Sequence, residues 1–274
     1  TMHAQIKSNQ ATSALSNSSN SSNSPNSHNL NNTSYSQLDP VAKQFVPSVQ
    51  ELNITPQELA DPIGDDIHTN NKIPGIIHRY PDRCLLQPVH VCPVYCRFCF
   101  RREKVGTGSK VLSNNQLEQA YNYIQSNPNI WEVILSGGDP LILKPKQIKN
   151  ILTKLADIKH VEVIRIHTRV PVVDPARINP EMLDALKLPN KPTYIIIHAN
   201  HANEFSAAAQ KSCSMLVDHG IPLLSQSVLL KGINDNAQDM EKLMRTFVKN
   251  RIKPYYLHHP DLAKGTGHFR TNIQ

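Results

Sequence analysis

Short hydrophobic runs alternate with amphipathic segments of helix length from residue 84 onward. The runs, expected to be strands, cover residues 84–90, 131–136, 161–168, 194–198, 223–229 and 255–258. The segments between them predict helices over residues 114–126, 146–156, 180–188, 203–219 and 237–249. Repeated strand–helix units indicate an α/β fold with a mainly parallel sheet. Six strands joined by right-handed crossovers predict an open or partial (β/α)6 barrel, short of a closed eight-stranded one.

The first 80 residues follow neither pattern. Residues 1–38 are dominated by Ser and Asn and offer almost no apolar side chain, so we expect a disordered tail. Residues 39–80 scatter apolar positions among prolines and glycines, which predicts an N-terminal extension of short helical turns and loops. Residues 81–274 are then expected to form the partial barrel.

Composition excludes several classes of protein. None of the apolar runs approaches the roughly 18 residues of a membrane-spanning helix, and no secretion signal opens the chain, so we expect a cytoplasmic protein without membrane contact. The net charge of +7 comes without an aromatic–basic motif, which makes nucleic-acid binding an unfavoured interpretation. Three of the five cysteines fall within eight positions, which favours a reducing compartment and a metal site over disulfides.

Polar residues follow each hydrophobic run, at the place where a parallel sheet gathers its chemistry. They are His90 and Cys92, Ser136 to Asp139, His167 to Arg169, His198 to His201, Gln226 and Ser227, and His258 to Asp261. Six loops converging on one rim predict an active site there.

The cysteine cluster has the spacing C-x3-C-x2-C over Cys92, Cys96 and Cys99. Three thiolates can bind three irons of a 4Fe–4S cubane and leave the fourth iron open to another ligand. Zinc is the competing interpretation, but a structural zinc site needs four ligands and usually a second cysteine pair, which this sequence lacks. Cys84 and Cys213 stand alone and are expected to be small core residues.

This triad, with Tyr95 and Phe98 inside it, resembles the motif of the radical S-adenosylmethionine (SAM) superfamily. The resemblance implies that the open iron binds SAM and that one electron cleaves SAM to a 5'-deoxyadenosyl radical. It also implies a partial (β/α)6 barrel, in agreement with the six strands counted from the hydrophobic pattern.

A second motif, Ser136-Gly137-Gly138-Asp139, follows the second predicted strand. Paired glycines let a backbone approach a ligand closely, and an acidic side chain can receive an ammonium group. In the superfamily this position contacts the methionine part of SAM. The ordinary alternative is a strand-ending turn with an aspartate helix cap.

Longer motifs at 78–83, 99–103, 163–173, 198–204, 226–235 and 254–261 resemble the lysine 2,3-aminomutase family. That family includes the enzyme that makes (R)-β-lysine for elongation factor P, and the resemblance covers about residues 61–270. It implies pyridoxal 5'-phosphate beside the cluster, and 2,3-migration of an amino group, most simply from L-lysine to β-lysine. Glutamate and arginine are alternative substrates. The implied partners are the amino acid substrate, a one-electron donor such as flavodoxin or ferredoxin, and further copies of the chain in a homo-oligomer.

The resemblance also implies roles for individual residues. Arg79, Tyr80 and Arg83 correspond to the pyridoxal phosphate site, and two guanidinium groups suit a phosphate, although a surface basic pair is the ordinary alternative. Arg101 corresponds to the arginine that binds the substrate α-carboxylate. Asp261 corresponds to a carboxylate that receives the distant ammonium of lysine, with a helix cap before residues 262–265 as its alternative.

One family feature has no counterpart before Gln274, namely the Gly-rich segment that carries the Schiff-base lysine. We therefore expect a C-terminally truncated form with no catalytic lysine of its own. Two other interpretations stay open: a non-catalytic chain that only binds cluster and SAM, and a metal-dependent barrel hydrolase. The hydrolase would use histidines at strand ends, namely His198, His201, His258 and His259.

Overall fold

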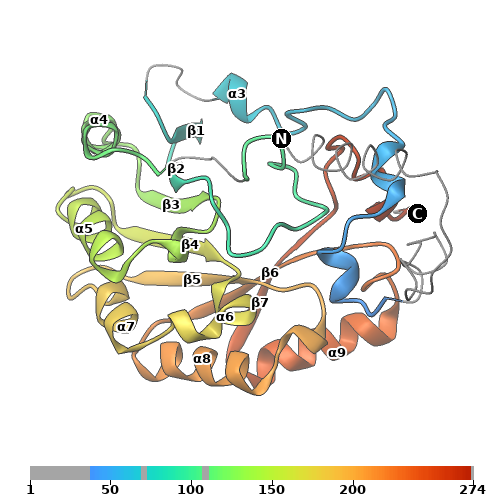
Figure 1. Ribbon diagram of the computed structural model, residues 1–274. Coiled ribbons are helices and arrows are strands. Elements are labelled where there is room, and N and C mark those ends of the chain that lie inside the picture. The colour runs from blue at the N-terminus through green and yellow to red at the C-terminus, as the bar shows by residue number, and fades with distance from the viewer. Residues whose placement is uncertain (1–37, 69–72, 107–110, 273–274) are drawn as a thin grey trace, which may run out of the picture.

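A curved seven-stranded sheet forms the centre of the structure, a computed structural model that describes residues 38–68, 73–106 and 111–272 (Figure 1). Its strands, in spatial order, are β1 (Ile76–Tyr80), β2 (Arg83–Val89), β3 (Glu132–Gly137), β4 (Val163–Thr168), β5 (Thr193–His198), β6 (Leu223–Val228) and β7 (Ile252–His258). Strands β2 to β7 are parallel to their neighbours, and β1 is antiparallel to β2. The predicted α/β architecture with six parallel strands is confirmed. The predicted tail, residues 1–38, lies outside the described residues apart from Leu38.

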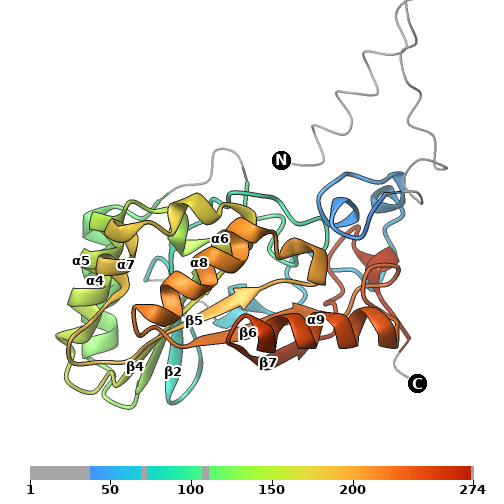
Figure 2. The same cartoon turned by 90° about the horizontal axis from the view of Figure 1, so that it is seen from below.

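Helices cover the convex face of the sheet (Figures 1 and 2). They are α4 (Asn114–Gln125), α5 (Pro145–Ala156), α6 (Val170–Val173), α7 (Pro180–Leu186), α8 (Ala207–Asp218) and α9 (Ala237–Lys249). Ser113, Asn179, Ser206 and Asn236 each accept a first-turn backbone N–H and so fix where a helix begins. None of the helices in the described ranges combines the length and apolar composition that a bilayer crossing requires.

The single helix predicted over residues 203–219 is wrong in its first turn. Residues Ala202–Glu204 form a separate 3-10 turn, η5, and α8 begins only after Ser206. The side chain of Ser206 caps α8 by accepting a hydrogen bond from the backbone N–H of Ala209. A residue that caps one helix ends the run before it, so the two elements are distinct.

The hydrophobic core lies between the sheet and these helices. Alternate residues of the parallel strands, such as Leu135, Ile166 and Ile197, are fully buried and pack against Leu152 of α5 and Leu216 of α8 in one continuous cluster. Burial of one such side chain stabilises the fold by about 1.5–3 kcal/mol. The opposite residues of the same strands line the concave face, which is where the polar residues gather.

A polar contact between distant strands demonstrates the curvature. Arg165 of β4 donates a hydrogen bond of 2.8 Å to the hydroxyl of Tyr256 on β7, and pairs with Glu132 of β3 at 2.5 Å. In a flat sheet β4 and β7 would lie about 14 Å apart, at roughly 4.8 Å per strand. The sheet is therefore an open, partial barrel with a polar interior.

The two edge strands differ from the sequence-based expectation. The prediction of short helical turns and loops over residues 39–80 is wrong at β1, which pairs with β2 as a hairpin in which Tyr80 faces Arg83. β7 begins at Ile252, three residues before the predicted strand, although it contains Pro254. An edge strand tolerates proline because one side of its backbone needs no ladder hydrogen bond.

The N-terminal extension consists of η1 (Ala42–Gln44), η2 (Val49–Leu52) and α3 (Asp65–His68), joined by loops. It lies beside the C-terminal segment, blue next to red in Figures 1 and 2. Leu59 donates its backbone N–H to the carbonyl oxygen of Leu262 at 2.8 Å, and Gly265 donates to the carboxylate of Glu58 at 2.7 Å. The beginning and the end of the described chain thus pack together against the barrel.

The core makes a direct prediction about stability. Phe247 of α9 is fully buried and meets the ring of Phe205 edge-on, with centroids 5.6 Å apart. Phe247→Ala should lower the free energy of unfolding by about 3–5 kcal/mol in urea denaturation, because it leaves a cavity. Its neighbour Val248 is 64% exposed, so Val248→Ala should change that energy by about 0.5 kcal/mol or less. Equal losses in the two variants would contradict this packing.

Candidate functional site

The three clustered cysteines lie on the loop that follows β2. Backbone hydrogen bonds from Cys99 to Cys96 and from Arg102 to Cys99 fold this loop into consecutive turns. Burial raises the pKa of the Cys99 thiol to about 11, and it also raises the pKa of Cys92 and Cys96. The thiols are therefore protonated at neutral pH without metal, and a bound metal would have to displace those protons.

The three thiols of the loop are not grouped around a single point. Within the described ranges, no group of three or more His, Cys, Asp or Glu side chains is placed to hold one metal ion. A cubane does not need such a grouping, because each thiolate binds a different iron. Cys84 and Cys213 are buried separately in the core, as predicted.

The glycine motif is docked on the cysteine loop by its backbone. Gly138 donates to the carbonyl oxygen of Val89 at 2.8 Å, and Asp139 donates to that of Val91 at 2.9 Å. Gly137 has φ of +103°, and a Cβ on Gly138 would overlap the backbone of Val91. Both positions therefore require glycine, one for its conformation and one for the close approach. The structure brings residues 136–139 directly beside the cysteine triad.

The Asp139 carboxylate is buried and accepts three hydrogen bonds within the protein. It accepts hydrogen bonds from the hydroxyl of Thr168 at 2.7 Å, the backbone N–H of Arg169 at 2.7 Å and that of Leu141 at 3.1 Å. Burial raises the pKa of Asp139, although these three bonds act in the opposite direction. Asp139 thus ties the loop after β3 to the loop after β4, and it also caps the short turn η3 (Pro140–Ile142).

Arg169, at the end of β4, holds the site together. Its Nη1 donates to Sγ of Cys96 at 3.0 Å, and its Nη2 donates to Oε1 of Gln44 at 3.1 Å and pairs with Glu204. Its guanidinium also lies over the ring of Phe45, 5.0 Å from the centroid. Sequence analysis placed Arg169 on the rim without a role, and nothing in the sequence indicated Gln44.

A buried carboxylate of the N-terminal extension clamps the same loop. Glu51 pairs with Arg97 at 2.5 Å and with Arg102 at 2.6 Å, and all three side chains are buried. Burial acts to raise the pKa of Glu51, but the two guanidinium groups outweigh it and hold that pKa below its ordinary value. Arg97 also donates its backbone N–H to Gln44 at 2.8 Å. Sequence analysis missed this clamp because its partners lie 46 and 51 residues apart.

The two predicted substrate residues face the same region. Arg101 donates from Nε to Asp65 of α3 at 2.8 Å, and its two terminal nitrogens have no hydrogen-bond partner among the described residues. Burial raises the pKa of the half-buried Asp261, against the opposing charges of His258, Arg270 and Arg101. Asp261 caps no helix, since residues 262–265 form a bridge and a turn.

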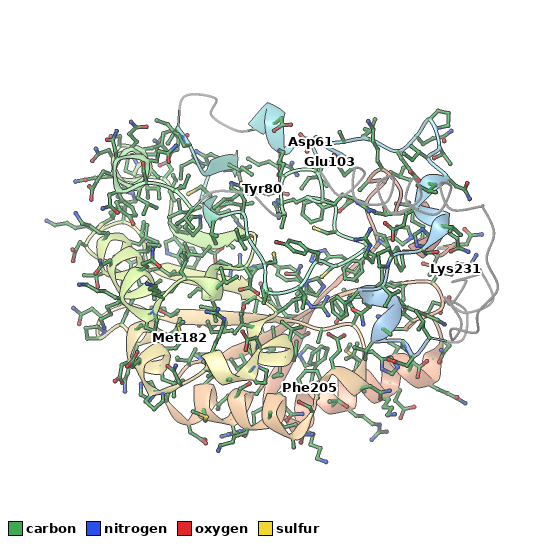
Figure 3. The ribbon with its side chains drawn as sticks, viewed as in Figure 1. Asp61, Tyr80, Glu103, Met182, Phe205 and Lys231 are labelled. Carbon is green, nitrogen blue, oxygen red and sulfur yellow. The ribbon has the colours of Figure 1, made fainter. Side chains whose placement is uncertain are left out.

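The predicted pyridoxal phosphate residues lie at the other end of β2. Arg79 donates to the carbonyl oxygen of Ile63, and Arg83 grips the Asp82 carboxylate through two bonds of 2.9 Å. Tyr80 is exposed on β1 (Figure 3), its ring centroid 5.6 Å from the Arg83 guanidinium. Arg83 begins β2 and the cysteines follow its end, so about 20 Å of strand separates them. The structure does not bring these residues to the cysteine triad.

Two histidines on the concave face carry buried ring nitrogens without partners. His167 is hydrogen bonded to Gln226 through Nδ1 at 2.7 Å, while its Nε2 has no partner, and Nε2 of His198 has none either. Such atoms are places where a ligand inside the barrel could accept or donate a hydrogen bond.

Of the other rim histidines considered for a hydrolase, His201 accepts a hydrogen bond from the backbone N–H of Asn203 through Nδ1, and its buried Nε2 has no hydrogen bond within the described residues. His258 stacks on the ring of Tyr256, with centroids 5.2 Å apart, and His259 bonds to the backbone carbonyl of Thr271.

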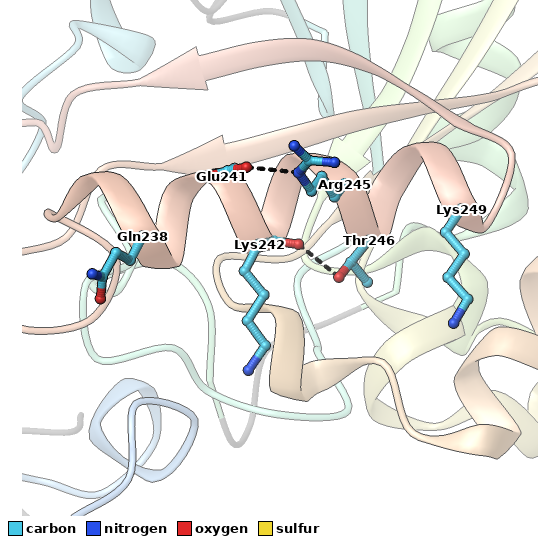
Figure 4. A pocket seen from close by; sticks show the side chains of 6 residues that line it. All are labelled: Gln238, Glu241, Lys242, Arg245, Thr246 and Lys249. Carbon is cyan, nitrogen blue, oxygen red and sulfur yellow. Dashed lines mark hydrogen bonds and ion pairs between the residues drawn. The ribbon is translucent and has the colours of Figure 1, made fainter.

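An open hollow on the outer face of α9 is not part of this site (Figure 4). It is lined by Gln238, Glu241, Lys242, Arg245, Thr246 and Lys249. The exposed side chains of Glu241 and Arg245 pair with each other at 2.7 Å along the helix. None of these residues comes from the cysteine loop or the rim.

Comparisons with known proteins identify the family to which the chain belongs. The profile of the radical SAM superfamily matches residues 86–247. The chain is 42% identical over 235 residues to L-lysine 2,3-aminomutase of Clostridium subterminale, covering 86% of this chain and 56% of that protein. It is 36% identical over 235 residues to glutamate 2,3-aminomutase of Clostridioides difficile (strain 630), covering 86% and 55%. The predicted resemblance is confirmed, and the chain spans about half the length of the curated relatives it matches.

A solved structure shares the fold. Native anSMEcpe with bound AdoMet and Cp18Cys peptide superposes with a TM-score of 0.51 at 10% identity, over 70% of this chain and 56% of that one. At this identity the likeness concerns the fold alone.

The Glu51 clamp predicts a large effect of removing one charge. Glu51→Gln should lower the free energy of unfolding by about 3–5 kcal/mol, because it removes the buried carboxylate that pairs with two buried guanidinium groups. Glu241→Gln is the matched control, since Glu241 belongs to an exposed ion pair (Figure 4) and its loss should cost less than about 1 kcal/mol. Urea denaturation of the metal-free proteins measures both, and a Glu51 variant as stable as the control would contradict the clamp.

The buried ring of His167 predicts a pH dependence of stability. Burial, assisted by the charge of Arg165, lowers the pKa of His167 to about 3, against about 6.5 in an unfolded chain. As pH falls below about 6.5 the unfolded chain binds a proton that the folded chain does not, so stability decreases, by about 2 kcal/mol at pH 5 from this residue. His167→Asn should therefore lose about 2 kcal/mol less than the wild type between pH 7.5 and 5 in urea denaturation. The same loss in both proteins would refute the assignment.

Proposed function

This chain belongs to the radical SAM superfamily, and from that membership we propose that Cys92, Cys96 and Cys99 hold a 4Fe–4S cluster whose fourth iron binds SAM. The observation that carries the proposal is the docking of Gly138 and Asp139 on the backbone next to Cys92. It brings the loop expected to bind SAM beside the loop expected to hold the cluster. With cluster and SAM bound by these residues, the site would have the chemistry to generate a 5'-deoxyadenosyl radical for hydrogen abstraction from the substrate.

The reaction that fits the remaining residues is migration of an amino group from C2 to C3 of an α-amino acid. Arg101 keeps two guanidinium nitrogens for the substrate α-carboxylate. Asp261 offers a carboxylate that accepts no hydrogen bond from the described residues, and therefore suits the distant ammonium of lysine. A carboxylate at this position disfavours glutamate by like-charge repulsion. L-lysine is thus the proposed substrate, and β-lysine the product.

Pyridoxal 5'-phosphate would carry the migrating amino group, and Arg79, Tyr80 and Arg83 are the residues proposed to hold its phosphate. The ion pair of Arg83 with Asp82 is about half exposed, and exposed pairs are weak enough to be exchanged for a phosphate dianion. Nη1 of Arg83 also lies 4.0 Å from the carboxylate of Glu132, the first residue of β3.

The chain's own residues contribute position and shielding. A primary carbon radical reacts with most groups that it meets, so the site has to exclude water and hold the reacting atoms in contact. The pairs of Glu51 with Arg97 and Arg102 cover the cysteine loop from one side. Phe98 packs against Phe269 of the C-terminal segment, with ring centroids 6.0 Å apart. These contacts support a closed cysteine loop.

The reaction needs an electron, and we propose a small one-electron donor such as flavodoxin or ferredoxin. Cysteines that stay reduced and bind iron are typical of a reducing compartment, which supports the cytoplasm as the location. Assembly into a homo-oligomer is part of the same proposal.

Metal loading tests the first half of the proposal. The chain reconstituted anaerobically with iron and sulfide should take up about four of each and turn brown. Alanine at Cys92, Cys96 or Cys99 should abolish this uptake, because each thiol is an iron ligand. Cys213→Ala is the control, since Cys213 is buried in α8 away from the loop, and its variant should load like the wild type. Uptake that survives loss of any triad cysteine would overturn the cluster assignment.

Product analysis tests the second half in the same preparation. With dithionite and SAM, 5'-deoxyadenosine should form, and with pyridoxal phosphate and L-lysine, β-lysine should appear in mass spectra. Glutamate and arginine, offered in parallel, should give no β-amino acid. If 5'-deoxyadenosine forms but lysine, glutamate and arginine all give no β-amino acid, the protein cleaves SAM and the proposed aminomutase activity is wrong.

A further inference from the structure

We propose that Arg169 raises the reduction potential of the cluster through its hydrogen bond and charge at the sulfur of Cys96, and that Glu204 limits this effect from the other side of the guanidinium. The inference rests on the proposed cluster. It assigns to two residues outside the cysteine motif the task of setting how readily the cluster accepts an electron.

The contact to sulfur is direct and buried. Nη1 of Arg169 lies 3.0 Å from Sγ of Cys96, and the Arg169 side chain is only 7% exposed. Hydrogen bonds to the sulfur ligands and the local charge are among the features that set the potential of iron–sulfur clusters. In a buried site water screens such a charge poorly, so its effect on a neighbouring sulfur is larger than at the surface.

The guanidinium cannot leave this position easily. Its Nη2 is held by Gln44 and Glu204, and the guanidinium carbon lies 5.0 and 5.9 Å from the ring centroids of Phe45 and Phe98. The backbone N–H of the same residue is bound to Asp139 of the glycine motif. Arg169 is therefore fixed at both its backbone and its side chain.

One donor of this guanidinium has no acceptor. Nε of Arg169 is buried and lacks a hydrogen-bond partner among the described residues. A buried donor without a partner costs about 1–3 kcal/mol, so its presence calls for a further acceptor. An inorganic sulfide of the cluster or a carboxylate bound to the open iron is such an acceptor by its chemistry.

The sign of the effect follows from charge. Reduction transfers one electron from an external donor to the cluster, from [4Fe–4S]2+ to [4Fe–4S]+, and adds one negative charge. A fixed positive charge and a donated hydrogen bond stabilise the more negative state, whereas the carboxylate of Glu204 opposes it. Lysine would keep the charge but not the planar fork that serves Cys96 and Glu204 together.

The test is a redox titration of the reconstituted protein without SAM, followed by the electron paramagnetic resonance signal of the reduced cluster. Arg169→Gln should lower the equilibrium constant for reduction at least tenfold, which is about 59 mV for one electron. Glu204→Gln should shift the potential upward, because Arg169 then lacks its counter-charge. Arg169→Lys should fall between Arg169→Gln and the wild type. The exposed Arg245→Gln, on α9, is the control and should leave the potential unchanged.

The opposite signs separate tuning from a structural role. Residues that only stabilise the loop would lower cluster content in both variants, without moving the two potentials in opposite directions. A fully loaded Arg169→Gln variant with the wild-type potential overturns the inference. If that variant does not assemble a cluster, Glu204→Gln decides, and an unchanged or lowered potential in it overturns the inference equally. A wild-type chain that takes up no iron overturns the proposed function as well.

Discussion

Burial of the Arg169 charge is the constraint around which the site is organised. An unpaired guanidinium in a protein interior costs several kcal/mol, so it needs a counter-charge and hydrogen-bond acceptors. Its acceptors come from the loops after β2 and β5 and from η1, while its backbone N–H binds the loop after β3. Satisfying one cation therefore fixes four segments that are distant in sequence. The cysteine loop has a defined conformation because these segments do.

A second buried set of ion pairs holds the cysteine loop from the N-terminal extension. Glu51 is a buried anion between Arg97 and Arg102, two cations that belong to the cysteine loop itself. The buried carboxylates of Glu204 and Glu51 are each paired with buried guanidinium groups, so that these charges are compensated away from water. These buried ion pairs can exclude water from around a reduced cluster, which is negatively charged together with its thiolates.

Much of the fold is predictable because buried parallel strands are continuous apolar runs, and those of β3, β4 and β5 were found to within two residues. Cys92 and Gly138 were identified because their motifs are local in sequence. Gln44 and Glu51 were missed because their partners lie far along the chain and polar loop residues carry no periodic signal. The hairpin of β1 was missed because its register depends on pairing with β2, which no single-strand pattern reveals. Residue roles taken from the family resemblance, such as those of Arg79 and Arg83, stay predictions.

The central claim is that three cysteines hold a cubane whose fourth iron is reserved for SAM. Mössbauer spectroscopy of the chain reconstituted with iron-57 tests it directly, because each iron contributes separately to the spectrum. The account predicts that adding SAM changes the signal of about one quarter of the iron and leaves the rest unchanged. A spectrum in which all the iron responds alike, or none does, would contradict the account.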